Sequence, residues 1–313
     1  MKRRSQRGVA LVLVISVVTL LAIAAGSFAY SVRTDARAAR NAALVARGEA
    51  IAQAAIARTA IELFKPQASP EVWRRQDEPR PWAFDGARVS VRFADESAKI
   101  DVNSANNELL KGLFRFAGAD EEEAVRLLDS VLDWRDADAL KRPFGAEEPD
   151  YARAGLRHRP ANYPFQSTEE MQLVFGMRPE LYQRIAPMIT VHSRQPGVNP
   201  HYATREVLLA IPGVTAEQVD AYLAERAAAA AEKRGLPLFS AAGGYANYAQ
   251  GGAATIRADV EVDGNLRVSR EAVVVITPQF SRRPYATLAW REPLAPPPSP
   301  AAAPSEEALV GRR

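Results

Sequence analysis

The chain is organised around Val9-Ala-Leu-Val-Leu-Val-Ile-Ser-Val-Val-Thr-Leu-Leu-Ala-Ile-Ala-Ala-Gly-Ser-Phe-Ala-Tyr30. This segment lies within 25 consecutive uncharged residues between Arg7 and Arg33. A helix of that length can cross the roughly 30 Å hydrocarbon core of a bilayer. The cations that precede it favour a cytoplasmic N-terminus; they are Lys2, Arg3, Arg4 and Arg7. We therefore expect a single-pass protein of the bacterial inner membrane with its C-terminal part in the periplasm.

The junction between the cationic leader and the apolar run indicates the kind of membrane segment. A secretory signal has an apolar run of about 7–15 residues before a small-residue cleavage site, and this run is longer. Gly8 is followed at once by the apolar run, so cleavage after Gly8 would leave the helix at the mature N-terminus. The layout resembles the class III signal of type IV pilins and type II secretion pseudopilins. A plain single-span anchor and an uncleaved signal peptide are the alternatives.

The fifth residue of a mature chain beginning at Val9 is Leu13. Most pilin-like subunits carry Glu there, and a buried carboxylate is costly unless it is paired, as it can be with the N-terminal amine of a neighbouring subunit. A subunit with none above it has no amine to neutralise. Leu13 therefore points to a tip subunit, although a simple anchor would also have an apolar residue here.

Composition indicates a folded, exported, non-enzymatic chain. The 313 residues are 25% charged and 47% hydrophobic, which suits a stalk plus roughly two domains. The formal charge of +3 becomes −1 without the four leader cations, so no basic stripe predicts nucleic-acid binding. Cysteine is absent, and His158, His192 and His201 belong to no metal or triad motif. Phosphate loops and nucleophile elbows are also absent.

Periodicity predicts an α+β fold with a long N-terminal helix on an antiparallel sheet. Ala, Arg and Glu favour one helix from Val9 to Phe64, and prolines at 66, 70, 79 and 81 then predict an irregular connection. Strands are expected at 88–93, 254–262, 266–277 and 285–290, with Asp263-Gly264 as a hairpin turn. This is the plan of the pilin fold.

A large all-helical insertion is expected between the first strand and the later ones. The predicted helices span 105–116, 121–135, 168–176, 179–186, 203–211 and 216–234. Ser167-Thr-Glu-Glu170 and Thr215-Ala-Glu-Gln218 have the form of capping boxes. Residues 241–252 read as a mobile loop, and the Pro- and Ala-rich end as disordered. The expected units are a leader (1–8), a transmembrane and stalk helix (9–65), a head (66–102 and 236–292), the insertion (103–235) and a tail (293–313).

The insertion contains a weak internal sequence repeat. Two segments, one leading to Phe116-Ala-Gly118 and one to Ile211-Pro-Gly-Val214, resemble helix-hairpin-helix units of the SAM-like kind found in DNA-binding proteins. Those units use a Gly-x-Gly turn to direct backbone amides at a phosphate. The second Gly is absent in both turns here, so packing of the insertion is favoured over DNA capture.

An acidic cluster follows the second predicted helix of the insertion. Within 18 residues the chain has six carboxylates, several on predicted loop: Asp133, Asp136, Asp138, Glu147, Glu148 and Asp150. Such oxygens suit Ca²⁺, which takes 6–8 oxygen ligands in flexible geometry. The spacing is not that of an EF-hand, because Leu140 occupies the fifth loop position and Gly is missing from the sixth. A solvated acidic loop without metal is the alternative.

Motif order supplies a specific resemblance. The chain is similar to the general secretion pathway protein K family, the large minor pseudopilins of type II secretion, from Gly8 to about Trp290. The motifs are Lys99-Ile-Asp-Val-Asn103, Leu132-Asp-Trp-Arg-Asp-Ala-Asp138, Gly145-Ala-Glu-Glu148, Tyr151, Arg159-Pro-Ala-Asn162, Pro164-Phe-Gln-Ser-Thr-Glu-Glu170 and Val174-Phe-Gly-Met177. Two departures are Pro149, which interrupts an acidic pair, and Asn199-Pro-His-Tyr-Ala203, where the family has Asn-x-Asn-Thr-Ala.

The resemblance implies a pilin-like head with a helical insertion, a Ca²⁺-binding region for one or two ions, and a place at the pseudopilus tip. The metal candidates carried over are the same six carboxylates. Implied partners are two other minor pseudopilins, the major pseudopilin, the inner-membrane assembly platform, and a prepilin peptidase that cleaves after Gly8, after which Val9 would be methylated. A membrane-anchored DNA-binding module and a minor pilin of a type IV pilus remain as alternative functions.

Overall fold

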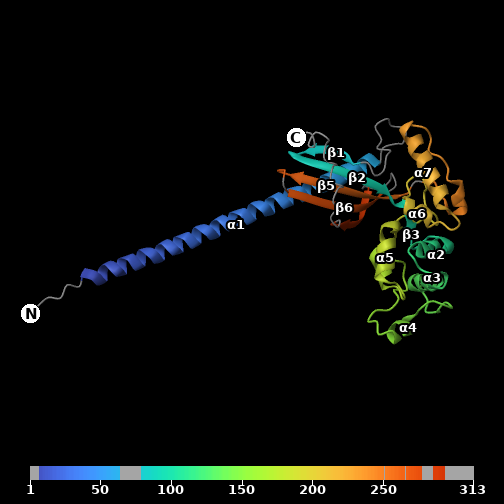
Figure 1. Cartoon of the computed structure of the whole chain (residues 1–313), viewed down its shortest axis with the longest axis horizontal. Coiled ribbons are helices and arrows are strands. Elements are labelled where there is room, and N and C mark those ends of the chain that lie inside the picture. The colour runs from blue at the N-terminus through green and yellow to red at the C-terminus, as the bar shows by residue number, and fades with distance from the viewer. Residues whose placement is uncertain (1–6, 64–78, 250, 265, 277–284, 293–313) are drawn as a thin grey trace, which may run out of the picture.

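A computed structural model describes residues 7–63, 79–249, 251–264, 266–276 and 285–292. Helix α1 (Arg7–Leu63) extends far from a folded body made of a sheet and a group of short helices (Figure 1). Leader residues 1–6, most of the Pro-rich connection (64–78) and the tail (293–313) lie outside the described residues. The single long helix expected from Val9 to Phe64 is confirmed over its described length.

The two halves of α1 have different surroundings. Its N-terminal half is apolar and exposed, whereas Ile51, Ala55 and Ile56 in its C-terminal half are buried against the sheet. Gly48 allows the closest approach, because a Cβ there would lie 2.6 Å from Val268 Cγ2. Burial of each large aliphatic side chain in this contact contributes about 1.5–3 kcal/mol, so the apolar packing holds the helix on the head.

The sheet contains β1 (Arg80–Phe84), β2 (Ala87–Asp95), β5 (Ala253–Val262), β6 (Leu266–Ile276) and β7 (Tyr285–Arg291) in the order β1-β2-β5-β6-β7. All neighbours are antiparallel. Alternate residues, such as Val89, Val91 and Phe93 in β2, point toward α1. The four strands read from alternation are confirmed within one or two residues.

One strand was not expected. β1 contains Pro81, which we had placed in an irregular connection, so that assignment was wrong. Proline is tolerated there because β1 is an edge strand, where a missing N–H interrupts no ladder between two neighbours. A tight turn joins β1 to β2 with positive φ at Asp85 (49°) and Gly86 (73°), matching the predicted β5–β6 turn at Asp263 (50°) and Gly264 (76°).

The helical insertion leaves the sheet after β2 and returns at β5 (Figure 1). Its helices are α2 (Asn107–Phe116), α3 (Glu121–Arg135), α4 (Glu148–Arg153), α5 (Pro179–Ile185), α6 (Arg205–Leu209) and α7 (Ala216–Ala231). Short 3₁₀ segments η1 (Glu96–Ala98), η2 (Thr168–Leu173), η3 (Ala186–Met188) and η4 (Ser240–Tyr245) complete it, with a parallel pair β3 (Ile100–Asp101) and β4 (Ile189–Thr190). Its core is separate from that beneath the sheet.

Three local expectations for the insertion were wrong. Residues 168–173 form a 3₁₀ helix rather than an α-helix, although the predicted capping boxes at Ser167 and Thr215 are present. Part of the acidic segment expected as loop is α4. The segment expected as a mobile loop from 241 contains part of η4, whose Ala242 is fully buried in the insertion core. In the second and third of these segments, tertiary burial stabilises helical turns that local propensity did not predict.

Buried Glu96 joins the head to the insertion. Its carboxylate accepts hydrogen bonds from Thr255 of β5, from Thr190 of β4 and from Lys99, whose Nζ lies 2.8 Å away. Burial alone would raise the pKa of Glu96, but the charge of Lys99 and these hydrogen bonds outweigh it and hold the pKa below its usual 4.5. The ionised form is therefore the one that stabilises the junction.

We predict that Glu96→Gln lowers the free energy of unfolding at pH 7 by about 1–3 kcal/mol, because a charge-assisted network is lost. A lowered folded-state pKa contributes stability above pH 4.5, and that contribution disappears as the pH falls through the folded value. The difference between wild type and variant should therefore shrink below pH 4.5. Thermal unfolding of the detergent-solubilised chain from pH 7 to pH 3 checks this, with exposed Glu225→Gln as control.

Candidate functional site

The exposed half of α1 is the first functional element. Residues 10–63 include an 18-residue window of mean hydropathy 2.6 with no part buried, and this is the one such helix among the described residues. Gly8 and Val9 lie in the first turns of α1, and Leu13 is 65% exposed. A helix that is apolar around its circumference and covered by nothing in the monomer requires a bilayer or other helices.

The six candidate ligands lie around the end of α3 and the start of α4. Asp133 is in the last turn of α3 and Asp136 caps it, whereas Asp138 lies in the following turn. Glu147 caps α4, and its first turn holds Glu148 and Asp150. The structure thus brings the two halves of the cluster, separated by eight residues in sequence, to neighbouring helix ends.

Basic side chains contact several of these carboxylates. Asp133, fully buried, accepts hydrogen bonds from Arg142 Nη1 at 2.7 Å and from the Arg142 backbone N at 3.2 Å. The same guanidinium pairs with Asp136. Asp150 Oδ1 lies 3.0 Å from Lys141 Nζ. Lys141 and Arg142 are the functional residues that sequence reasoning missed; their position between the two acidic groups was the available signal.

The remaining carboxylates differ in their partners. Glu148 pairs with the exposed Arg159 at 3.3 Å, and Asp138 accepts from the backbone N of Leu140 at 2.8 Å. Glu147 is only 5% exposed, and its Oε1 has no hydrogen-bond partner. Asp136 Oδ1 is likewise buried without a partner. Two carboxylate oxygens are therefore left unsatisfied inside the cluster, an arrangement that normally has a high energetic cost.

The pKa values of the cluster follow from burial and like charge. Burial raises the pKa of Glu147, and the surrounding carboxylates, Asp133, Asp136, Asp138 and Asp150, raise it further. Burial also raises the pKa of Asp133, despite the opposing effect of Arg142. The pKa of Asp150 is lowered by the Glu147 backbone N–H, with Lys141 and Arg153 adding to the effect. Negative charge in the cluster is thus incompletely compensated by the protein itself.

These residues fit a hard cation in donor chemistry. Every candidate ligand is a carboxylate, and the unsatisfied oxygens of Asp136 and Glu147 are what a Ca²⁺ ion would complete. Among the described residues no three Asp, Glu, His or Cys side chains are gathered as around a metal ion. The ligand set therefore remains a prediction, and a bound ion would require the loop between the two helices to rearrange.

Aromatic side chains pack beside the acidic cluster in the insertion core. Trp134 is 3% exposed, and its ring stacks on Phe165 with centroids 5.9 Å apart. Asn103 fixes Phe165 through two hydrogen bonds, donating from Nδ2 at 2.9 Å and accepting at Oδ1 from Phe165 N at 2.8 Å. Trp134 is therefore a packing residue of the insertion core, and Asn103 has a structural role beside it.

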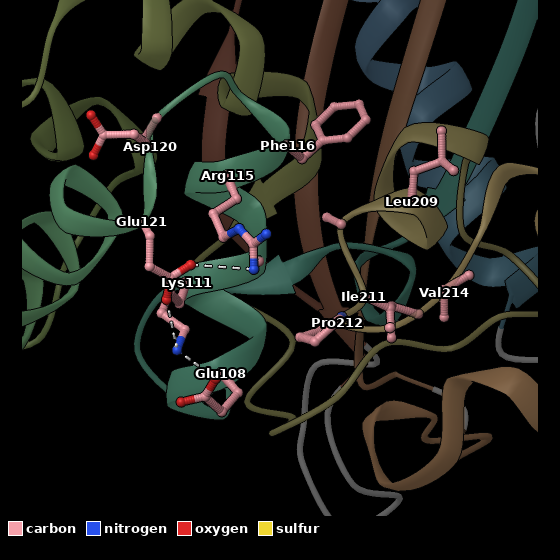
Figure 2. Close-up of a pocket in the computed structure, with 14 residues that line it drawn as sticks. Glu108, Lys111, Arg115, Phe116, Asp120, Glu121, Leu209, Ile211, Pro212 and Val214 are labelled. Carbon is pink, nitrogen blue, oxygen red and sulfur yellow. Dashed lines mark ion pairs between the residues drawn. The ribbon is translucent and has the colours of Figure 1, made fainter.

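The two hairpin turns of the internal repeat, near Phe116 and Ile211, line one cavity of about 530 Å³ (Figure 2). Its cations are already paired: Lys111 Nζ lies 2.9 Å from Glu108 and Arg115 Nη1 lies 3.3 Å from Glu121. The amides of Gly118 and Ala119 donate to carbonyls of α2 rather than into the cavity. With neutralised cations, a carboxylate-rich wall and occupied turn amides, the arrangement does not suit a DNA phosphate.

The histidines make separate packing contacts. His158 Nε2 lies 2.9 Å from Leu173 O, and its ring meets the edge of Tyr151. His201 Nε2 lies 3.1 Å from Pro237 O. His192 is half-buried, and its burial lowers its pKa. These contacts provide no catalytic constellation among the described residues.

Comparison with known proteins agrees with this architecture. The family model for type II secretion system protein K matches residues 89–194, from β2 through the insertion to just beyond β4. The chain is 27% identical to type II secretion system protein K of Aeromonas hydrophila over 214 residues, covering 59% of this chain and 63% of that protein. It is 26% identical to the Pseudomonas aeruginosa protein K over 245 residues, covering 70% and 73% respectively. By these matches the chain is similar to the type II secretion system protein K family.

A solved structure supports the fold of this chain. The chain resembles a protein in the GspK-GspI-GspJ complex of enterotoxigenic Escherichia coli with a TM-score of 0.57, 17% identity, and coverage of 84% of this chain and all of that one. That similarity confirms the predicted α+β architecture of long helix, antiparallel sheet and helical insertion. The family resemblance read from motif order is likewise confirmed.

Gly145 gives a direct test of the packing around the acidic cluster. A Cβ at this buried position would lie 1.9 Å from Asp133 Oδ2 and 3.1 Å from the Asp129 carbonyl oxygen. We predict that Gly145→Ala displaces the Asp133 carboxylate and lowers the free energy of unfolding by about 1–3 kcal/mol. Thermal unfolding measures this. Gly235→Ala is the control, because a Cβ at Gly235 would meet nothing within 4 Å; equal stability of the two variants would contradict the packing described.

Proposed function

We propose that this chain is a minor pseudopilin that caps the tip of the periplasmic pseudopilus of a type II secretion system. The observation that carries the proposal is the division of α1 into a half packed on the head and an uncovered apolar half. Similarity to the protein K family supports the assignment to type II secretion. The role is structural: the subunit starts or limits assembly of a filament that exports folded proteins across the outer membrane.

The uncovered half of α1 performs the assembly step by packing. Its large side chains are 48–75% exposed over the membrane segment; they include Leu11, Val12, Ile15, Leu20, Ile23, Phe28 and Tyr30. In the inner membrane these side chains contact lipid, and in the filament they contact the helices of other subunits. Leu13 presents no carboxylate, so this subunit needs no amine from a subunit above it. The N-terminus is cytoplasmic and the head periplasmic.

The insertion supplies the capping step. It lies beyond the sheet, at the opposite end of the molecule from the N-terminus of α1 (Figure 1). A body in that position leaves the apolar helix free to join the subunits below and places a bulky surface where a further subunit would stack. The proposed partners are two minor pseudopilins corresponding to GspI and GspJ in the similar complex, together with the major pseudopilin and the assembly platform.

Processing tests the pseudopilin assignment. We predict that co-expression with a prepilin peptidase yields a mature chain beginning at Val9 with a methylated N-terminus, measured by intact-mass spectrometry of the membrane fraction. Gly8→Leu should keep the leader, whereas Gly26→Leu, within the same apolar run, should still be processed. An intact wild-type leader, or cleavage near Ala25, would contradict the assignment.

Partner capture separates the alternatives. Affinity purification of the detergent-solubilised chain should recover the two other minor pseudopilins of the type II system. Recovery of type IV pilus minor pilins would favour that alternative. A salt-dependent shift of duplex DNA would favour the DNA-binding module.

We further propose that the acidic cluster binds one or two Ca²⁺ ions. The all-carboxylate donor set and the unpartnered, buried Glu147 oxygen support this. The ion would supply the missing positive charge and tie α3 to α4, and the candidates to hold it are the six carboxylates described above. No catalytic chemistry is required of it.

We predict stoichiometric Ca²⁺ binding by calorimetry after chelator treatment, with a raised melting temperature. Asp138→Ala should weaken binding roughly tenfold or more, because an exposed candidate ligand is lost without opening the core. Asp133→Ala should abolish binding but also destabilise the metal-free chain. Exposed Glu225→Ala is the control. Absence of binding by the wild type would reduce the cluster to a charged surface loop.

A further inference from the structure

Lys141 and Arg142 extend from the loop between α3 and α4 toward the acidic groups. The Arg142 guanidinium contacts Asp133 and Asp136 together. The Lys141 ammonium lies 3.0 Å from Asp150 on the other helix. Two adjacent residues of one loop therefore direct positive charge into both halves of the cluster.

The two cations are held differently from the other bases nearby. Arg142 is 34% exposed. Its backbone N donates to Asp133, so both its main chain and its side chain contact the cluster. Arg153 and Arg159 are 74% and 71% exposed and lie on the rim. Exposed pairs of that kind contribute little, so Arg142 supplies most of the neutralisation at Asp133 and Asp136, and the 44% exposed Lys141 supplies a smaller part at Asp150.

This internal neutralisation is incomplete. Glu147, 95% buried, keeps an oxygen without any partner, and Asp136 keeps a second. Two monovalent cations on long side chains satisfy part of the cluster, whereas a divalent ion bound by several carboxylates would satisfy more of it. Both side chains have stems long enough to swing outward to solvent when displaced.

We propose that Lys141 and Arg142 are tethered counter-ions that hold the acidic loop together without metal and that Ca²⁺ must displace. The inference rests on the calcium site proposed above and adds its regulation. The same residues stabilise the metal-free state and lower the apparent calcium affinity, because binding has to break their ion pairs.

Under this proposal Arg142 stabilises the metal-free chain but opposes Ca²⁺ binding, and Arg142→Gln tests both effects. We expect the metal-free melting temperature to fall, the dissociation constant for Ca²⁺ to fall about tenfold, and the calcium-induced rise in melting temperature to grow. Lys141→Gln should act in the same direction with a smaller effect, because Lys141 pairs only with Asp150 in the cluster. Arg126→Gln removes the same charge from an exposed pair on α3 and should leave all three quantities unchanged.

The measurements use the detergent-solubilised full chain, calcium chloride titrations and thermal unfolding with and without chelator. If Arg142 only stabilised the fold, Arg142→Gln would bind Ca²⁺ more weakly than the wild type. Unchanged or weaker Ca²⁺ binding by both variants would overturn the counter-ion role but leave the calcium site intact. Binding by Arg142→Gln alone, with none by the wild type, contradicts the calcium site proposed for the native chain and leaves only the counter-ion role of Arg142. No binding by the wild type or either variant overturns the calcium site and this inference together.

Discussion

The apolar contact between the second half of α1 and one face of the five-stranded sheet is the interaction on which the molecule depends. Gly48 lets the helix approach β6, and Ile51 and Ile56 fill the space beneath the strands. Arg47 pairs with Asp85 in the β1–β2 turn and with Asp263 in the β5–β6 turn, and both turns lie at the same end of the sheet. A helix held so firmly along half its length projects its other half as a rigid rod, which is what a membrane-embedded assembly helix requires.

The insertion depends on that head through polar rather than apolar contacts. The two hydrophobic cores are separate, and the junction between them is occupied by buried acidic residues. The Glu96 carboxylate links β4 of the insertion to β5 of the sheet by accepting hydrogen bonds from Thr190 and Thr255. Hydrogen-bonded carboxylates are directional, so they define the orientation of one unit on the other more narrowly than apolar packing would. A defined orientation matters for a body whose proposed role is to cap a filament.

In the acidic cluster, negative charge is only partly neutralised by nearby basic side chains. Burial and mutual repulsion oppose the ionised state of Glu147, and the available bases neutralise only part of the charge. Such a site stores unfavourable electrostatic energy that a divalent cation would relieve. Under the proposal made above, Lys141 and Arg142 and a bound Ca²⁺ would compete for the same carboxylates. This competition could not be inferred from the number of acidic residues alone.

The sequence by itself determined the long helix, its apolar exposed half, four of the five sheet strands and most insertion helices. These features follow from local periodicity, capping residues and chain length, which act over a few residues. Motif order also indicated the family resemblance. β1 was missed because Pro81 opposes a strand locally, and its place at the sheet edge removes the cost. Only the tertiary structure placed Arg142 between Asp133 and Asp136, left Glu147 Oε1 without a hydrogen-bond partner and brought both hairpin turns to one cavity. Those arrangements depend on which side chains meet after folding and on how far water is excluded, and neither is encoded in the spacing of residues along the chain.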